Sequence, residues 1–190
     1  MAKQQIDFFT EIPKYPEGFR YEEDLISPED ERVLIEQVRA LPLQEFEFHG
    51  YLGKRRVKSF GWHYDFHDEK LKQTDPIPEF VLPLRERVAR FANLASEEIQ
   101  HVLFTEYDHA GIGWHRDKAT FGDVIGVSLL APCTFRLRRK VGADWERFSL
   151  EAEPRSAYLM RGPSRTEWEH SIPTVDGIRY SITFRTLRKK

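Results

Sequence analysis

Residues 178–186 read IRYSITFRT, a stretch in which apolar and polar side chains alternate from Ile178 to Arg185. A period of two is typical of a β-strand with two different faces. Two guanidinium groups on an inward face are costly unless anions lie between them, so the pattern favours a pocket for a dicarboxylic acid. The apolar face carries Tyr180, Ile182 and Phe184, and the polar face carries Arg179, Ser181, Thr183 and Arg185.

The two arginines of this stretch are too far apart to bind one small group together. They are six positions apart, which corresponds to about 20 Å along an extended strand. We therefore expect Arg179 and Arg185 to serve different parts of one site. The alternative, a solvated edge strand whose arginines have no ligand, stays open at this point.

The remainder of the second half is also predicted to form strands, because short apolar runs alternate with Gly, Pro or Asp clusters. A helical first half, a strand-rich second half and no βαβ alternation favour an α+β, mainly β fold. We expect a double-stranded β-helix, a jelly-roll or cupin-like barrel braced by N-terminal helices. The predicted strands are His101–Tyr107, Val124–Leu130, Cys133–Arg139, Trp145–Leu150, Ala157–Met160, Glu167–Ser171 and Ile178–Thr186.

The first half is predicted to contain two helices and a hairpin region. Ser27 and Asp30 form a capping-box pattern at the start of the first helix, which Pro42 should stop. A second helix is expected over residues 79–94, and hairpins over about 46–68. We expect an N-terminal extension, residues 1–97, packed as one compact unit with a core, residues 98–190.

Composition limits the class of protein. Hydrophobic residues make up 40% and charged residues 32% of the 190 residues, which is typical of a soluble globular domain. No apolar run approaches the roughly 20 residues that span a bilayer, and the N-terminus lacks the apolar core of a secretory signal. One cysteine excludes an intrachain disulfide. We expect a cytoplasmic monomer without a membrane partner, and the net charge of −2 means that any nucleic acid must be gripped by local basic patches.

A second pattern indicates a metal site. His115 and Asp117 are two positions apart, and on an extended segment such residues point to the same face. His170 follows 53 positions after Asp117, a separation that a barrel can close. Two imidazoles and one carboxylate are the facial triad that holds non-haem ferrous iron. The H-x-D spacing alone is a weak signal.

These motifs occur in a fixed order: FTEYDHAGIGWHRDK at 104–118, CTFRLRRK at 133–140, EWEHSIP at 167–173 and RYSITFR at 179–185. In this order the chain, over about residues 98–187, resembles the AlkB family of iron(II)- and 2-oxoglutarate-dependent dioxygenases. The resemblance implies a catalytic iron held by His115, Asp117 and His170, with dioxygen as a substrate. It implies 2-oxoglutarate bound by Tyr107, Thr105, Arg179, Ser181 and Arg185.

Three positions depart from the family pattern. Thr105 and Ser181 stand where the family often has asparagine, and both are still polar. Ala119 stands where many members that act on nucleobases carry a second acidic residue, and Asp123 is a candidate substitute.

The resemblance also implies a hairpin lid over the substrate, and the stretch YLGKRRVKSFGWHYDF at 51–66 fits it. Cations beside aromatic rings suit phosphate neutralisation together with base stacking. The alternative is an exposed charged hairpin whose aromatic rings pack on the core. The candidate substrate-binding residues are Lys54, Arg55, Arg56, Trp62 and Tyr64. A second basic group, Arg136, Arg138, Arg139 and Lys140, could follow a nucleic-acid backbone.

The resemblance implies an enzyme that oxidatively dealkylates N-alkylated bases in single-stranded or flipped-out DNA or RNA, as in repair of alkylation damage. Such a reaction releases an aldehyde, succinate and CO2. The same iron chemistry on a protein side chain or a small metabolite is the alternative, favoured by net acidity and Ala119. A catalytically silent metal-binding module is a third possibility, against which the complete triad and both arginines count.

Overall fold

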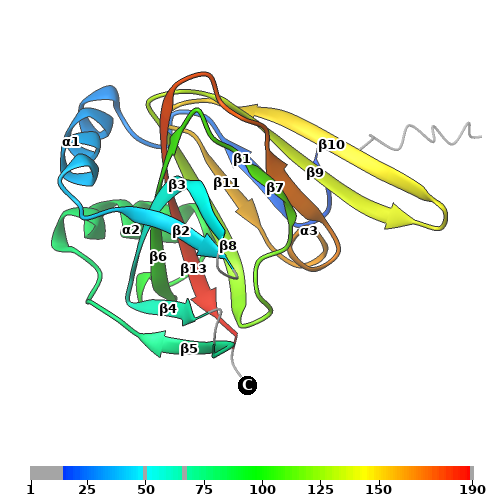
Figure 1. Cartoon of the computed structure of the whole chain (residues 1–190), viewed down its shortest axis with the longest axis horizontal. Coiled ribbons are helices and arrows are strands. Elements are labelled where there is room, and N and C mark those ends of the chain that lie inside the picture. The colour runs from blue at the N-terminus through cyan, green and yellow to red at the C-terminus, as the bar shows by residue number, and fades with distance from the viewer. Residues whose placement is uncertain (1–14, 49–50, 66–67, 189–190) are drawn as a thin grey trace, which may run out of the picture.

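Two antiparallel sheets facing one another form the body of the protein, and a computed structural model describes residues 15–48, 51–65 and 68–188 (Figure 1). The larger sheet has the strand order β1-β11-β8-β13-β6-β3-β2, and the smaller sheet has the order β10-β9-β12-β7. The larger sheet consists of β1 (Phe19–Glu22), β2 (Gln44–Phe48), β3 (Tyr51–Phe60), β6 (Ile99–Asp108), β8 (Phe121–Leu129), β11 (Ala157–Met160) and β13 (Ile178–Leu187). The smaller sheet consists of β7 (Ile112–His115), β9 (Cys133–Val141), β10 (Asp144–Ala152) and β12 (Glu169–Ile172).

The strand that carries IRYSITFRT lies inside the larger sheet. β13 pairs with β6 on one side and with β8 on the other, so the alternative of a solvated edge strand is wrong. Its alternation is confirmed, because Tyr180, Ile182 and Phe184 pack into the apolar core on the outer side of this sheet. The expected jelly-roll barrel, mainly β with helices outside, is confirmed by this arrangement of two facing sheets.

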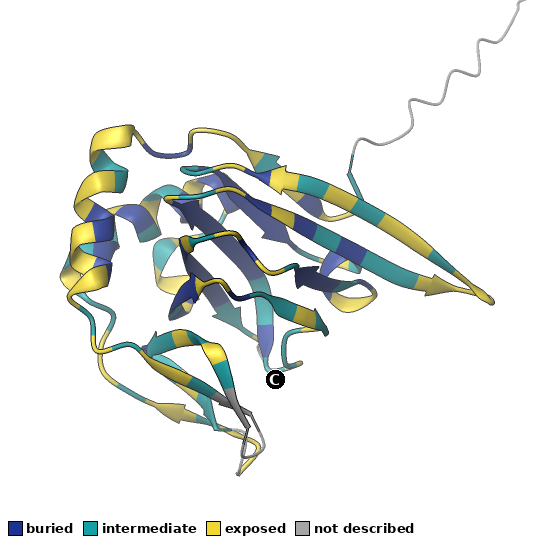
Figure 2. Cartoon of the chain, turned by 45° about the horizontal axis from the view of Figure 1, so that its top comes forward, coloured by how far each residue is buried: buried dark blue, intermediate teal, exposed yellow. Residues whose placement is uncertain are grey.

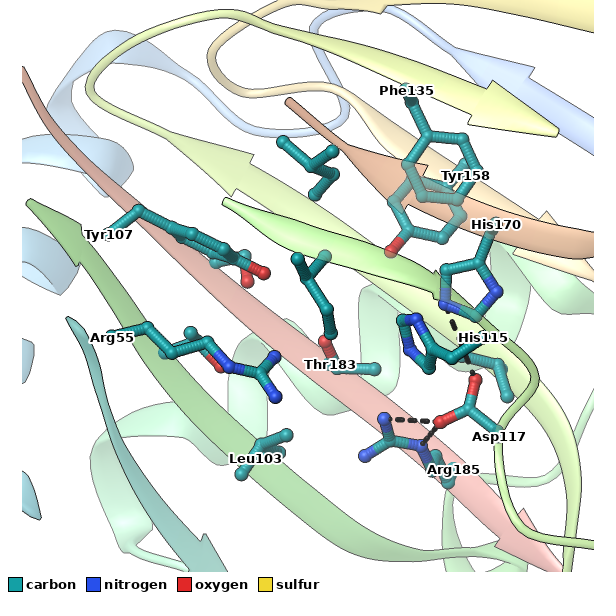
Figure 3. A pocket seen from close by; sticks show the side chains of 15 residues that line it. Arg55, Leu103, Tyr107, His115, Asp117, Phe135, Tyr158, His170, Thr183 and Arg185 are labelled. Atoms are coloured by element: carbon teal, nitrogen blue, oxygen red, sulfur yellow. Dashed lines mark hydrogen bonds and ion pairs between the residues drawn. The ribbon is translucent and has the colours of Figure 1, made fainter. Parts of the chain in front are cut away.

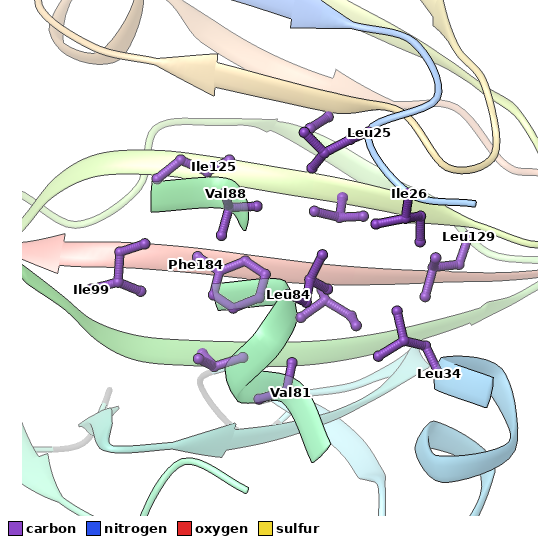
Figure 4. Packing of buried hydrophobic residues seen from close by; sticks show 14 of the residues in the cluster. Leu25, Ile26, Leu34, Val81, Leu84, Val88, Ile99, Ile125, Leu129 and Phe184 are labelled. Atoms are coloured by element: carbon purple, nitrogen blue, oxygen red, sulfur yellow. The ribbon is translucent and has the colours of Figure 1, made fainter. Parts of the chain in front are cut away.

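The two longer helices cover the outer face of the larger sheet (Figure 4). α1 (Pro28–Arg39) begins at the expected capping box, in which the Ser27 hydroxyl accepts a hydrogen bond from the Asp30 amide at 3.1 Å. The second predicted helix is divided into a 3-10 turn, η1 (Glu79–Val81), and α2 (Leu82–Ala92). It ends before Leu94 because Asn93 takes a left-handed conformation, with φ of 53°. Two short elements, η2 (Ser96–Glu98) and α3 (Pro163–Thr166), complete the helices.

β7 is a strand that the sequence did not predict. It pairs with β12 around a bulge, so that both Ile112 and His115 line the space between the sheets. The close approach requires Gly111, since a side chain there would place its Cβ 2.5 Å from the carbonyl oxygen of Ile172. The strand is short and irregular, and its glycines made the sequence look like a loop.

The expected hairpin region contains two different hairpins. β3 runs through Gly53 and pairs with β2, whereas β4 (Trp62–Asp65) pairs with β5 (Lys70–Gln73), beyond the expected end of the region. β3 also pairs with β6. Strands from both sides of the expected boundary at residue 97 therefore share one sheet, and the division into 1–97 and 98–190 stays a prediction.

Buried side chains concentrate between and within the sheets, while the far end of the β9–β10 hairpin is exposed on both faces (Figure 2). In the described parts of the chain, no helix is both long enough and apolar enough to cross a membrane.

Candidate active site

A pocket lies between the two sheets and receives side chains from both (Figure 3). From the smaller sheet come His115 on β7, Phe135 on β9 and His170 on β12. The larger sheet supplies Arg55 on β3 and the polar face of β13. The polar face predicted from IRYSITFRT thus points to the interior of the barrel.

The three predicted metal ligands lie together in this pocket. His115 and His170 are opposite one another in the β7–β12 pairing, with ring centroids 4.1 Å apart. Asp117 follows the end of β7, and its Oδ2 lies 3.8 Å from Nε2 of His170. Nδ1 of His115 lies 2.8 Å from the Gly113 carbonyl oxygen. A neutral ring that donates from Nδ1 presents its Nε2 lone pair as a ligand.

The environment holds the triad in the protonation states that bind a cation. Burial lowers the pKa of His170 to about 3, and burial also lowers the pKa of His115. Burial opposes ionisation of Asp117, but the Arg185 guanidinium and neighbouring cations outweigh it and hold the pKa of Asp117 well below its usual range. Nε and Nη2 of Arg185 both donate to Oδ1 of Asp117, at 3.0 and 2.7 Å. Two neutral imidazoles and a carboxylate result.

The donor set fits a ferrous ion by chemistry and proximity. Oδ2 of Asp117 is buried without a hydrogen-bond partner, and such an oxygen requires a cation or a donor. Among the described residues, however, no group of three or more His, Cys, Asp or Glu side chains already stands at ion-binding geometry. An ion would therefore have to draw the three side chains together.

A second set of polar groups lies around Arg179, which is 1% exposed. Its Nε and Nη2 donate to the Ser128 hydroxyl at 3.2 and 3.0 Å, and its Cζ lies 5.1 Å from the Tyr107 ring centre. Nη1 of Arg179 is buried without a partner. A carboxylate would satisfy this atom. Arg179 does not line the pocket itself, but it packs against Tyr107, which does. Thr105 and Ser181 lie opposite one another on β6 and β13 and both line the pocket.

The sequence pattern of the 2OG-Fe(II) oxygenase superfamily matches residues 18–185. The chain belongs to this superfamily. It is an AlkB-like 2-oxoglutarate-dependent dioxygenase, and the family uses Fe(II), 2-oxoglutarate and O2.

Two curated relatives carry names that refer to nucleic acids. The oxygenase is 28% identical over 165 residues to "Alkylated DNA repair protein ALKBH8 homolog" of Arabidopsis thaliana, with 73% of this chain and 48% of that protein covered. It is 26% identical over 168 residues to "tRNA (carboxymethyluridine(34)-5-O)-methyltransferase alkbh8" of Xenopus tropicalis, with 84% of this chain and 26% of that protein covered. The chain thus spans about half or less of the length of these relatives.

Two solved structures share the fold of the oxygenase. The structure titled "The structure of OsALKBH1" superposes with a TM-score of 0.71 at 16% identity, covering 89% of this chain and 96% of that chain. A Pseudomonas putida prolyl-4-hydroxylase superposes with a TM-score of 0.61 at 12% identity, covering 91% and 94%. At these identities the likeness concerns the fold.

The predicted basic patch of the oxygenase is divided between two faces of β3. Arg55 lines the pocket, and its Cζ lies 4.1 Å from the Phe46 ring centre. Arg56 points away and forms a two-point ion pair with Glu106, at 2.7 and 2.9 Å. Lys58 pairs with Asp75 at 2.8 Å, and Lys54 is exposed. Of these four cations, the structure brings Arg55 to the pocket.

The aromatic residues of the expected lid lie on β4. Trp62 and Tyr64 are half-buried, and neither lines the pocket. Nζ of Lys118 lies 5.0 Å from the Tyr64 ring centre. Since Lys118 follows Asp117 directly, β4 contacts the segment that carries the candidate iron ligand. Phe66 lies outside the described residues.

Asp123 does not replace the acidic residue absent at Ala119. Its carboxylate accepts a hydrogen bond from Nε of Arg161 at 2.8 Å, and it does not line the pocket. Asp117 is the one carboxylate that lines the pocket among the described residues.

Sequence reasoning missed three residues of this site. Tyr158 lines the pocket from β11, but every residue of that short strand is buried, so no alternation marked its inward face. Ser128 positions Arg179. Arg165 donates to the carbonyl oxygens of Lys118, Phe121 and Gly122, at 2.8, 3.0 and 3.0 Å, and so fixes the segment after Asp117. Burial of Ser128 and Arg165 depends on tertiary packing and leaves no local signal.

Proposed function

We propose that this oxygenase removes N-linked alkyl groups oxidatively from bases of DNA or RNA. The printed names of the two curated relatives, one referring to alkylated DNA and one to a tRNA uridine, support a nucleic-acid substrate. The observation that carries the proposal is the position of Arg55, which projects from the candidate lid strand into the pocket that holds the triad (Figure 3). Within the described residues, no carboxylate forms an ion pair with Arg55, so an anionic or polar group of the substrate can take that place.

The roles of the residues follow from their contacts. His115, Asp117 and His170 would hold the iron, and Arg185 keeps Asp117 ionised and oriented. Arg179, fixed by Ser128 and packed beside Tyr107, would hold the distal carboxylate of 2-oxoglutarate. When bound, iron and 2-oxoglutarate supply the oxidation of a C–H bond by dioxygen, with 2-oxoglutarate converted to succinate and CO2.

The remaining chemistry needs no hydrolytic residue. Oxygen insertion into the C–H bond next to a base nitrogen gives a hemiaminal, which breaks its C–N bond, releases an aldehyde and returns the proton to the base nitrogen. The protein positions the alkyl group and excludes water. Buried aliphatic side chains at the pocket, including Val124 and Ile172, suit the exclusion of water.

Succinate and formaldehyde release across methylated DNA, RNA and nucleosides tests the proposal. We expect stimulated release with a methylated single strand and none with His115→Ala. Arg55→Ala should lower kcat/KM by about tenfold to a hundredfold, the range for a lost charge-assisted hydrogen bond. Arg56→Ala is the matched control. The Arg56 side chain lies on the face of β3 away from the pocket, so this substitution should leave kcat/KM within about twofold.

The same oxidation of a protein side chain or a small metabolite is the second candidate. It is favoured by Asp117 being the single carboxylate that the described part of the chain places at the pocket, with no second acid from that part to contact a base. Release stimulated by a peptide or metabolite, with none from any nucleic acid, would reject the nucleobase proposal in its favour.

A further inference from the structure

The outer face of the smaller sheet, on the side away from the pocket, carries a row of flat side chains and cations. In strand register, Arg138 on β9 lies opposite Arg147 on β10 and opposite Glu169 on β12. Lys140 lies opposite Trp145. Residues directly opposite in a sheet project to the same face, so these side chains share one surface.

Cations and indole rings alternate along this surface in one continuous ladder. Starting from β9, Arg136 lies 5.0 Å from the Trp114 ring centre, and Arg138 lies 4.4 Å from the same ring. Arg138 lies also 4.2 Å from the Trp145 ring centre, and Lys140 lies 5.3 Å from that ring. We call these five residues, Arg136, Trp114, Arg138, Trp145 and Lys140, the stacking ladder.

The members of the stacking ladder are accessible from solvent. Arg136, Arg138 and both tryptophans are partly exposed, and Lys140 and Arg147 are exposed. Packing within the core does not explain the rings, because the apolar side chains of β9, Phe135 and Leu137, point to the opposite face. Two large partly exposed aromatic rings on a protruding sheet are typical of a binding surface.

The charge of this face is opposite to that of the whole chain. Its register positions carry four cations, Arg136, Arg138, Lys140 and Arg147, against two carboxylates, Glu151 and Glu169. The chain has a formal net charge of −2. Arg138 donates a hydrogen bond to Glu169 at 2.7 Å and lies against both rings, so its guanidinium holds the two indoles in place. Arg147 has no ion pair with any described residue.

We propose that the outer face of the smaller sheet docks single-stranded nucleic acid, with bases stacked on the ladder and phosphates at Lys140 and Arg147. Indole rings and guanidinium planes both stack on bases, and every base offers a flat face. An acidic peptide would use the cations and leave the rings without a role. The choice of nucleic acid as the polymer rests on the proposed function, whereas the surface itself does not.

The surface is placed to serve the pocket. Trp114 precedes His115 on β7, so one member of the ladder and one candidate iron ligand occupy opposite faces of the same strand. On β12, Glu169, which holds Arg138, precedes His170. β7 is the edge strand of this sheet. A single-stranded nucleic acid docked on the outer face can therefore pass around β7 and deliver one nucleotide to the pocket.

Fluorescence anisotropy of short unmodified DNA and RNA oligonucleotides, titrated with the metal-free 190-residue chain, tests the surface without catalysis. Trp145→Ala should weaken binding by about tenfold, and Trp145→Phe, which keeps a ring, by about twofold to threefold. Arg147→Glu should weaken binding by about tenfold and lower the slope of log affinity against log salt by about one or more. Arg90→Glu, on α2 across the molecule, changes net charge equally and should stay within about twofold.

Three results would contradict or redirect the docking proposal. The proposal is overturned if Trp145→Ala binds like the wild type, or if Arg90→Glu and Arg147→Glu lose affinity equally. Should polyglutamate displace the oligonucleotide with no dependence on Trp145, the surface is an acidic-peptide site instead. If Trp145→Ala does not fold, as judged by thermal melting, Trp145→Phe and Arg147→Glu still decide the matter.

Failure of this proposal can be separated from failure of the proposed function. Oligonucleotide binding that depends on Trp145, without turnover of any nucleic acid, would reject the dealkylase and keep the docking surface. Turnover of a methylated strand with binding independent of Trp145 and Arg147 would do the reverse.

Discussion

His170 is the side chain of the pocket whose protonation is changed most plainly by folding. It is 8% exposed, and burial lowers its pKa from 6.5 to about 3. Between these two values the unfolded chain binds a proton that the folded protein does not bind. The free energy of unfolding of the metal-free protein should therefore decrease as pH falls below about 6.5, by at most about 1.4 kcal/mol per pH unit for this group.

His170→Gln should reduce this pH dependence, and urea unfolding at about pH 7 and about pH 5 measures it. Some dependence will remain, because burial also lowers the pKa of His101 and of His115. Asp117 acts at lower pH. Its pKa is depressed from 3.8, so its contribution to the free energy of unfolding is present above pH 3.8 and is lost as the pH falls further. Equal slopes in the wild type and His170→Gln would show that folding does not lower the pKa of His170.

At the scale of the element, sequence patterns predicted those strands and helices that are determined by neighbouring residues. The alternation of β13 and the capping box of α1 are written in consecutive residues, and both were predicted correctly. β7 was missed because a bulge and Gly111 hide its pairing with β12. β3 was predicted as a basic stretch, but the sequence does not show that Glu106 on β6 binds Arg56 and leaves Arg55 to the pocket.

The contact between β8 and β11 fixes one wall of the pocket. A Cβ at Gly126 would lie 2.2 Å from Cζ of Tyr158, whose buried ring lies 4.3 Å from that of Phe135. Gly126→Ala should destabilise the protein by about 1–3 kcal/mol through overpacking. It should also weaken 2-oxoglutarate binding, because Tyr158 must move. Urea unfolding and thermal shift with 2-oxoglutarate measure the two effects.

Gly113→Ala on β7 is the matched control for this overpacking. Nothing lies within 4 Å of a Cβ at Gly113, so the free energy of unfolding should change by less than about 0.5 kcal/mol. If both alanine variants are equally stable, β11 does not pack on β8 as closely as the structure places it.

At the scale of the whole molecule, the site depends on the two sheets facing one another. The histidines come from the smaller sheet and the arginines from the larger one, and a separate apolar cluster between the sheets, including Phe135, Leu137 and Tyr158, holds them in place. The sequence predicted the triad and the arginine pair through their order along the chain. It could not predict Ser128, Tyr158 or Arg165, whose roles arise where distant strands pack together.

Ligands that bridge the sheets should stabilise the entire fold. A divalent ion and 2-oxoglutarate, each at about a hundred times its dissociation constant, would each add about 2.7 kcal/mol, or a Tm increase of about 5–10 °C in a chain of this size. Anaerobic thermal melting with Fe(II) and 2-oxoglutarate, alone and together, measures both increments.

Arg179→Met should lose the 2-oxoglutarate increment and keep that of the metal, since Arg179 lies apart from the triad. Arg161 pairs with Asp123 outside the pocket, so Arg161→Met should keep both the metal increment and the 2-oxoglutarate increment. An undiminished 2-oxoglutarate increment in Arg179→Met would mean that the unpartnered Nη1 is not where the co-substrate binds.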